Sequence, residues 1–320
     1  MLSAKENWLE AIRFGRPDYV PMGNESIGWT FGFDGNFCRE NWTDAWGVGW
    51  EVGLADTVPF PKHNPLPDLD RLEKYRFPDP GALLYTDEHR TGLAKARRED
   101  KHVSGLMTYL LFERAWAIMG MDSFLMALVT HPEESKVYLH KIADYARGVF
   151  QRYLDMGVDG IAFSEDLGTQ RALFVSPAMF REFILPEYQH CFQDVIAAGK
   201  VVHFHSCGCV TEIAADLASI PASLGGGPGQ MILNPIQHNA NDLVKVKRDT
   251  FGKIALHGAI NTAVLVRGTP DDVRREVAVV MEALKPGGGW VCSQDQGIPG
   301  IPPENTEAMW AAARELGRYR

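Results

Sequence analysis

The sequence predicts an α/β fold, a closed (β/α)8 TIM barrel with an aromatic-rich N-terminal extension. After Pro80, helix-like stretches alternate with short apolar runs, which is the pattern of a parallel sheet. No G-x-G-x-x-G follows an apolar run, so an open dinucleotide-binding sheet is not indicated. The chain has 320 residues, 45% of them hydrophobic, which leaves room for a barrel of about 250 residues and an extension.

The first 80 residues are expected to hold a helix, the first strand and an insertion. Ser3 and Glu6 have capping-box spacing before apolar residues at helical intervals, and Gly15 ends this helix. The extended piece "YVPMG" follows as the first strand. Residues 23–67 are dense in Gly, Pro and Trp, which is too aromatic for a flexible linker. We therefore treat residues 1–320 as one barrel domain in which residues 1–80 form this N-terminal part.

The remaining strands and helices follow in regular order. Strands are predicted from the apolar runs at 103–110, 157–164, 200–206, 230–235, 253–258 and 289–293. Helices are predicted at 112–120, 132–155, 177–198, 209–219, 241–250, 270–285 and 303–317. Several begin after Pro or Asp and end at Gly, as helix signals require.

Composition excludes several classes of protein. The net charge is −9, and no stripe of Lys and Arg offers a surface for nucleic acid or anionic lipid. The N-terminus lacks the features of a signal peptide, and no apolar run approaches a membrane span, so we expect a cytoplasmic protein. Five unevenly spaced cysteines argue against a disulfide framework.

Polar side chains gather at the predicted carboxyl ends of the strands, where barrel enzymes place their chemistry. The strand starts carry ordinary residues such as Lys200, Lys253 and Gly289. We therefore expect one mouth lined by substrate-contacting residues, namely Met22, Asn24, Glu25, Trp29, Phe31, Tyr109, Asn234 and His257. The aromatic members belong to a ring-rich stretch that is expected to offer a wall for a flat substrate, or alternatively to form a core beneath the extension.

The stretch "VVHFHSCGCV" at 201–210 suggests a metal site. Residues two apart on a strand face the same way, so His205 and Cys207 share a face. Cys292 ends another strand, and the three residues would form a Cys2His zinc set with an open fourth position, which is typical of catalysis. Cys209 is an alternative to Cys207, and His203 lies deeper and is expected to be a hydrogen-bonded interior residue.

Glu165 and Asp166 are adjacent at one strand end, so only one of them can point inward. Either is a candidate catalytic residue. The possible roles are a fourth zinc ligand displaced by substrate, a proton donor to the leaving oxygen, or a partner that orients His205. The alternative is a structural one, capping of the following loop.

Two long segments resemble the uroporphyrinogen decarboxylase superfamily. They are "FSEDLGTQRALFVSPAMFREFILPEYQHCFQDVIAAGKVVHFHSCG" and "GGGWVCSQDQGIPGIPPENTEAMW". The resemblance implies a (β/α)8 barrel and one of two activities, cofactor-free porphyrinogen decarboxylation or zinc-dependent, corrinoid-linked methyl transfer. The methyltransferase branch is marked by H-x-C and a distant third cysteine, for which this sequence offers His205, Cys207 and Cys292.

One departure separates the two branches. Decarboxylases of this superfamily carry an M-R-Q-A-G-R segment after the first strand, whereas no arginine lies between Arg16 and Arg39 here. The resemblance therefore favours a methyltransferase. It implies Zn²⁺ as cofactor and a corrinoid (cobalamin) carried by a partner protein.

Four functions stay open at this stage, and the last of them is a zinc-stabilised binding or partner-docking protein without chemistry of its own, which predicts four protein ligands and a closed metal site. The first is O-demethylation, in which zinc acts on the oxygen of an aryl methyl ether and Co(I) of the partner takes the methyl group. The second is a methylcorrinoid:thiol methyltransferase of the coenzyme M type, for which Arg171 is the candidate partner of a sulfonate. The third is a cofactor-free lyase like uroporphyrinogen decarboxylase. We expect the first.

Overall fold

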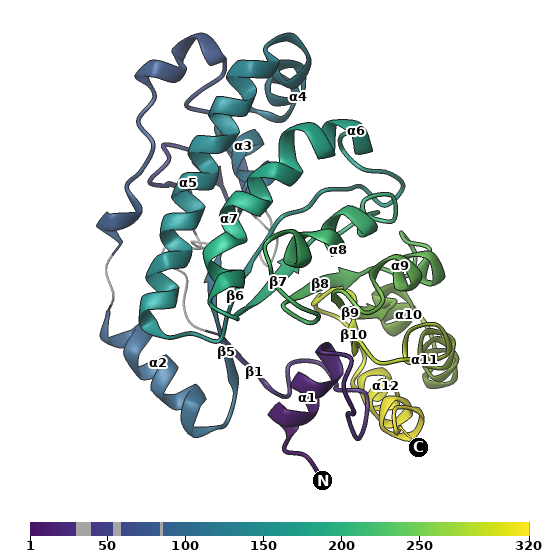
Figure 1. Cartoon of the computed structure of the whole chain (residues 1–320). Helices are drawn as coiled ribbons and strands as arrows, with labels where there is room; N and C mark the ends of the chain where they lie inside the picture. The colour runs from purple at the N-terminus through teal and green to yellow at the C-terminus, as the bar shows by residue number, and fades with distance from the viewer. Residues whose placement is uncertain (30–39, 54–58, 84–85, 320) are drawn as a thin grey trace.

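The structure is a computed structural model that describes residues 1–29, 40–53, 59–83 and 86–319 (Figure 1). Within these residues, seven parallel strands form one sheet in the order β1-β5-β6-β7-β8-β9-β10. Their bounds are β1 (Ile27–Trp29), β5 (His102–Met107), β6 (Gly160–Phe163), β7 (Val201–His205), β8 (Met231–Ile236), β9 (Ala255–Ile260) and β10 (Trp290–Gln294).

The two edges of this sheet are joined by the segment around residues 21–27. Cys292 of β10 donates its N–H to the carbonyl of Pro21 (2.8 Å), and its own carbonyl accepts from Gly23 (2.7 Å). Four residues after Met22, the carbonyl of Ser26 accepts from His102 at the start of β5 (2.8 Å). The sheet is therefore closed, and the predicted α/β barrel is confirmed. A turn at residues 23–26 interrupts the first strand, so "YVPMG" forms only isolated bridges, from Tyr19 to Arg318 and from Met22 to Cys292.

Helices follow the strands and cover the outside of the barrel (Figure 1). Most coincide with the predicted ranges, but the helix expected at 209–219 begins later, because Gly208 has φ +82° and Val210 donates to the side chain of Asn241. The range predicted at 177–198 is built from three consecutive segments. The bounds are α1 (Ala4–Ile12), α2 (Asp87–Arg98), α3 (Phe112–Met119), α4 (Met121–Thr130), α5 (Pro132–Met156), α6 (Pro177–Met179), η3 (Phe180–Ile184), α7 (Leu185–Ala197), α8 (Ala214–Ser223), α9 (Leu243–Thr250), α10 (Thr262–Arg267), α11 (Pro270–Leu284) and α12 (Pro303–Leu316), with 3-10 turns η1 (Leu69–Lys74) and η2 (Pro80–Ala82).

The N-terminal extension contains a small antiparallel sheet of β2 (Trp42–Thr43), β3 (Gly49–Glu51) and β4 (Phe60–His63). Trp50 of β3 is buried and stacks on Tyr109, which follows β5 (ring centroids 4.9 Å apart). Asp44 forms a buried ion pair with Arg114 of α3 (2.7 Å). These contacts tie the extension to the barrel, so part of the aromatic stretch is core, as the alternative interpretation expected.

Helix α1 closes the amino end of the barrel. Trp8 is fully buried and packs with the first residues of several strands, including Val201 and Ala255. Its ring lies 4.7 Å from His102 and stacks at 5.8 Å on His203 (centroid distances). The barrel interior at this end is filled by side chains, so access to the interior is left to the opposite end. Within the described residues, no helix has the length and apolar character that crossing a membrane requires.

We predict that Trp8→Ala lowers the free energy of unfolding by about 3–5 kcal/mol, because it leaves a large cavity under the strands. Leu9→Ala on the same helix is the matched control, with an expected loss of about 1 kcal/mol at a half-buried position. Urea unfolding of both variants measures the difference. A loss below about 1 kcal/mol for Trp8→Ala would contradict the sealing role of α1.

Candidate functional site

A cavity of about 650 Å³ opens at the carboxyl ends of the barrel strands. Its described lining comes from the turn before β1, from strands β7 to β10 and the segments that follow them, and from α12. These residues are Gly23, Asn24, His205, Cys207, Asn234, Pro235, His257, Ser293, Gln294, Asp295, Gln296, Gly297, Ile298 and Trp310. Three predicted substrate contacts, Asn24, Asn234 and His257, are therefore brought together as expected for the mouth of a barrel.

Asp166, His205 and Cys207 form a compact group at this mouth. One donor atom from each lies within 4.8 Å of the other two. The Nε2 atom of His205 is 3.5 Å from the Cys207 sulfur and 3.6 Å from Asp166 Oδ1. The backbone N–H of Cys207 donates to the same carboxylate oxygen (2.8 Å). A thiol, an imidazole and a carboxylate at this separation are a donor set that suits Zn²⁺.

Neighbouring side chains fix the orientation of this group. Asn234 Oδ1 accepts from His205 Nδ1 (3.2 Å), which places the proton on Nδ1 and turns the lone pair of Nε2 toward Cys207 and Asp166. Gln296 Nε2 donates to the Cys207 sulfur (3.8 Å). The supporting hydrogen bonds that metal sites require beyond their ligands are thus present.

Burial controls the protonation of two groups in the cavity. Burial, followed by the nearby Asp166 carboxylate, raises the pKa of the Cys207 thiol to about 12. The thiol therefore keeps its proton until a cation replaces it. Burial, together with the charge of His205, lowers the pKa of His257 to about 4, so this imidazole is neutral at physiological pH.

Cys292 does not join the group. Its neighbours Val291 and Ser293 face the inside of the barrel, since Val291 packs with Trp8 and Ser293 lines the cavity. Cys292 lies between them on the strand and faces outward, where it is fully buried in the core shared with the surrounding helices. The third member of the group beside His205 and Cys207 is Asp166, and not Cys292 as the sequence predicted.

Glu165 and Asp166 diverge as expected, with Asp166 turned to the mouth. The Glu165 carboxylate is fully buried and accepts hydrogen bonds from the N–H groups of Leu111 (3.1 Å) and Phe112 (2.5 Å) at the start of α3. The hydroxyl of Tyr188 also donates to it (2.7 Å). Glu165 therefore caps the amino end of α3, and the structure does not bring it to the cavity as a catalytic group.

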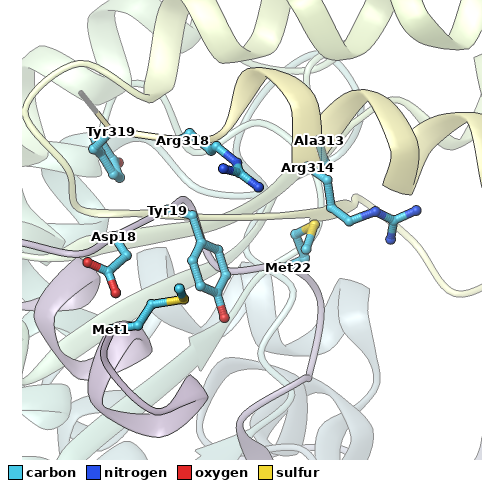
Figure 2. Close-up of a pocket in the computed structure, with 8 residues that line it drawn as sticks. All are labelled: Met1, Asp18, Tyr19, Met22, Ala313, Arg314, Arg318 and Tyr319. Carbon is cyan, nitrogen blue, oxygen red and sulfur yellow. The ribbon is translucent and has the colours of Figure 1, made fainter.

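The other predicted contacts fall elsewhere. Met22 lines a second cavity of about 480 Å³ beside Tyr19 and Arg318, which shares no residue with the first (Figure 2). Glu25 accepts from the N–H of Met22 (3.2 Å), and burial raises its pKa.

The aromatic candidates are only partly described. Tyr109 is buried beneath Trp50 and is absent from the described cavity lining. The backbone of Trp29 ends β1, and Phe31 lies outside the described residues.

Three residues of the site region escaped the sequence analysis. Trp310 of α12 and Gln296 line the cavity. Glu113 is buried behind Asp166, accepts hydrogen bonds from Ser164 and the N–H of Asp166, and has its pKa raised well above normal by burial and by the neighbouring carboxylates. The sequence holds no local signal for Trp310 or Glu113, because both are helix residues that tertiary packing carries to the site.

An α/β barrel with a donor cluster at its carboxyl end defines the class of this protein, and comparison with known proteins then gives its family. A family model described as uroporphyrinogen decarboxylase (URO-D) matches residues 42–316. The chain belongs to the uroporphyrinogen decarboxylase (URO-D) family.

Individual relatives agree with this assignment. A uroporphyrinogen decarboxylase of Legionella pneumophila (strain Paris) is 36% identical over 289 residues, which are 85% of this chain and 75% of that protein. The one from strain Corby is 37% identical over 76 residues, 23% of this chain, so the chain spans only 21% of that relative. Among solved structures, a methyltransferase from Methanosarcina mazei superposes with a TM-score of 0.68 at 17% identity, and the match covers 99% of each chain. At that identity the likeness shows the shared fold.

We predict a pH-dependent contribution of Glu165 to stability. Burial raises its pKa from 4.5 to about 7 in the folded protein. The folded state then binds the proton more tightly than the unfolded chain, so this contribution falls by up to about 3 kcal/mol as pH rises from about 4.5 to about 7.

Urea unfolding from pH 4 to pH 8, with chelator present, tests this prediction on the wild type and on Glu165→Gln, which does not titrate. The stability of the wild type relative to Glu165→Gln should decrease across the same interval. A difference that stays constant with pH would refute the raised pKa.

Proposed function

We propose that this protein transfers a methyl group from a methoxylated aromatic compound to the Co(I) corrinoid of a partner protein. One observation carries the proposal, namely the Asp166–His205–Cys207 group at the open end of the barrel. Cofactor-free decarboxylation gives no reason to gather a thiol, an imidazole and a carboxylate around one point. Membership of the family and a methyltransferase with the same fold are consistent with it.

Asp166, His205 and Cys207 would hold the zinc ion in this proposal. Three protein ligands leave a position for substrate, which is the arrangement of catalytic and not structural zinc. When bound, zinc would supply Lewis acidity toward the ether oxygen. The chain itself supplies orientation, because Asn234 holds the ring of His205 and Gln296 donates to the sulfur of Cys207.

The cavity walls suit an aromatic ether better than a polycarboxylate. Trp310 and Ile298 offer apolar surface for a ring. The neutral imidazole of His257 can donate a hydrogen bond to the phenolate oxygen that the reaction releases. None of the described lining residues is Lys or Arg.

Decarboxylation of a porphyrinogen is the second candidate, favoured by the names of the curated relatives. A substrate with many carboxylates requires cationic partners, and the described cavity offers the carboxylate of Asp295 instead. The thiol alternative has a similar difficulty, since its candidate cation, Arg171, is exposed and does not line the cavity. The experiments described below test both alternative activities.

We predict that zinc-loaded protein forms methylcobalt, seen by its absorbance, when mixed with a reduced corrinoid protein and a panel of methoxylated aromatics. Cys207→Ser and Asp166→Asn should each lower the rate at least 100-fold, because each removes a donor from the group. Cys209→Ser removes a nearby thiol outside the group and should retain the wild-type rate. Chelator treatment should abolish transfer, and added Zn²⁺ should restore it.

Two parallel reactions separate the alternatives. Methylcorrinoid is offered with a panel of thiols, and uroporphyrinogen is offered without metal. Carbon dioxide release from uroporphyrinogen that is insensitive to chelator and to Cys207→Ser would overturn the proposal in favour of decarboxylation. Methyl transfer to thiols alone would overturn the aryl ether as substrate.

A further inference from the structure

A second group of metal-binding side chains lies on the outside of the barrel, between α5 and α7. His140 and Asp144 are four residues apart on α5, and Glu187 and His190 are three apart on α7. Residues at these spacings lie on one face of a helix. Helices α5 and α7 lie side by side (Figure 1). His140 contacts Glu187 and His190 contacts Asp144, so the four side chains meet between the two helices.

The donor atoms are close enough to share one ion. Asp144 Oδ1 is 2.7 Å from His190 Nε2 and 3.8 Å from His140 Nε2. One donor from each of these three residues lies within 4.8 Å of the others, and the two imidazole centroids are 4.6 Å apart. Donors bound at about 2.0–2.1 Å to a common ion are at most about 4.2 Å apart, so the donor atoms of this group need to move only slightly to bind one ion.

We propose that His140, Asp144 and His190 form a second divalent metal site of the zinc class. Two imidazoles and one carboxylate favour Zn²⁺ over Mg²⁺ or Ca²⁺, which prefer oxygen donors alone. Water completes the coordination, because half of the His140 side chain and 57% of the Asp144 side chain are exposed. The ion would link α5 to α7 on the outer wall of the barrel.

Glu187 acts as a positioning residue for this site. Its Oε2 atom lies 2.9 Å from His140 Nδ1, so the proton of the ring is held on Nδ1 and the lone pair of Nε2 faces Asp144. The carboxylate–histidine pair is the usual support of an imidazole ligand. This contact explains why the ring of His140 is turned towards α7 although half of the side chain is exposed.

The two helices hold the donors in place before an ion arrives. Arg147 of α5 donates to Asp194 of α7 through Nε (2.6 Å) and a second guanidinium nitrogen (3.2 Å). Arg147 lies seven residues after His140 on α5, and Asp194 lies four residues after His190 on α7. This ion pair therefore holds the two helices together close to the proposed ligands. Sites on rigid elements lose little free energy to reorganisation on binding.

Titration of the metal-free protein with Co²⁺ tests this inference separately from the proposed function. The wild-type protein should bind two Co²⁺ ions. The ion at Cys207 should show thiolate-to-cobalt charge-transfer absorption, whereas the ion at His140, Asp144 and His190 should show only the visible ligand-field bands of Co²⁺. Cys207→Ser should retain only the second ion, and the His140→Ala/His190→Ala double variant should retain only the first. His238→Ala, which removes a histidine paired with the single carboxylate of Glu276, should bind as wild type does.

Binding of Zn²⁺ to Cys207→Ser, measured by calorimetry, completes the test. One ion should bind, and Glu187→Gln in that background should weaken it about tenfold without removing it, as expected for loss of a supporting partner. Failure of Cys207→Ser to bind a stoichiometric ion, or equal binding by the His140→Ala/His190→Ala combination, would overturn the inference. Loss of methyl transfer alone would bear on the barrel-mouth site and leave this inference standing.

Discussion

The alternation of side chains along the barrel strands is the constraint on which the rest of the structure depends. Ala162 of β6 pairs with His203 of β7. Continuing this register by two residues places Ser164 beside His205, and by four residues it places Asp166 beside Cys207. The inward positions therefore deliver a carboxylate, an imidazole and a thiol to one point. The outward positions deliver Glu165 to the start of α3 and Cys292 to the packing beneath the helices.

The two ends of the barrel have different roles. At the amino end, Trp8 fills the interior, and the apolar side chains packed around it stabilise the fold. At the carboxyl end, polar residues surround an open cavity. Glu165 lies at the carboxyl end but has a structural role, because its carboxylate caps α3 next to Asp166. A barrel that is rigid at one end can hold donors in a fixed arrangement at the other.

Much of the fold was predictable from the sequence, because strands and helices alternate with clear start and stop signals. That the side chains of His205 and Cys207 point the same way followed from their spacing alone. The direction of the Cys292 side chain could not be predicted, since it depends on the pairing of Val291 with His257 of the neighbouring strand. The role of Glu165 depends on helix α3, about 50 residues earlier in the chain. Trp310 lines the cavity from α12, where its ring lies against Gly23, nearly 300 residues away in the sequence. Local patterns carry no information on such contacts.

X-ray absorption spectroscopy of bound zinc tests the central claim most directly, namely that Asp166, His205 and Cys207 are the ligands. The His140→Ala/His190→Ala variant is the suitable sample, because it confines zinc to the barrel mouth. We expect one sulfur at about 2.3 Å and the remaining nitrogen or oxygen ligands at about 2.0–2.1 Å, unchanged by Cys292→Ser. Two sulfur ligands, one of them lost in Cys292→Ser, would contradict the account.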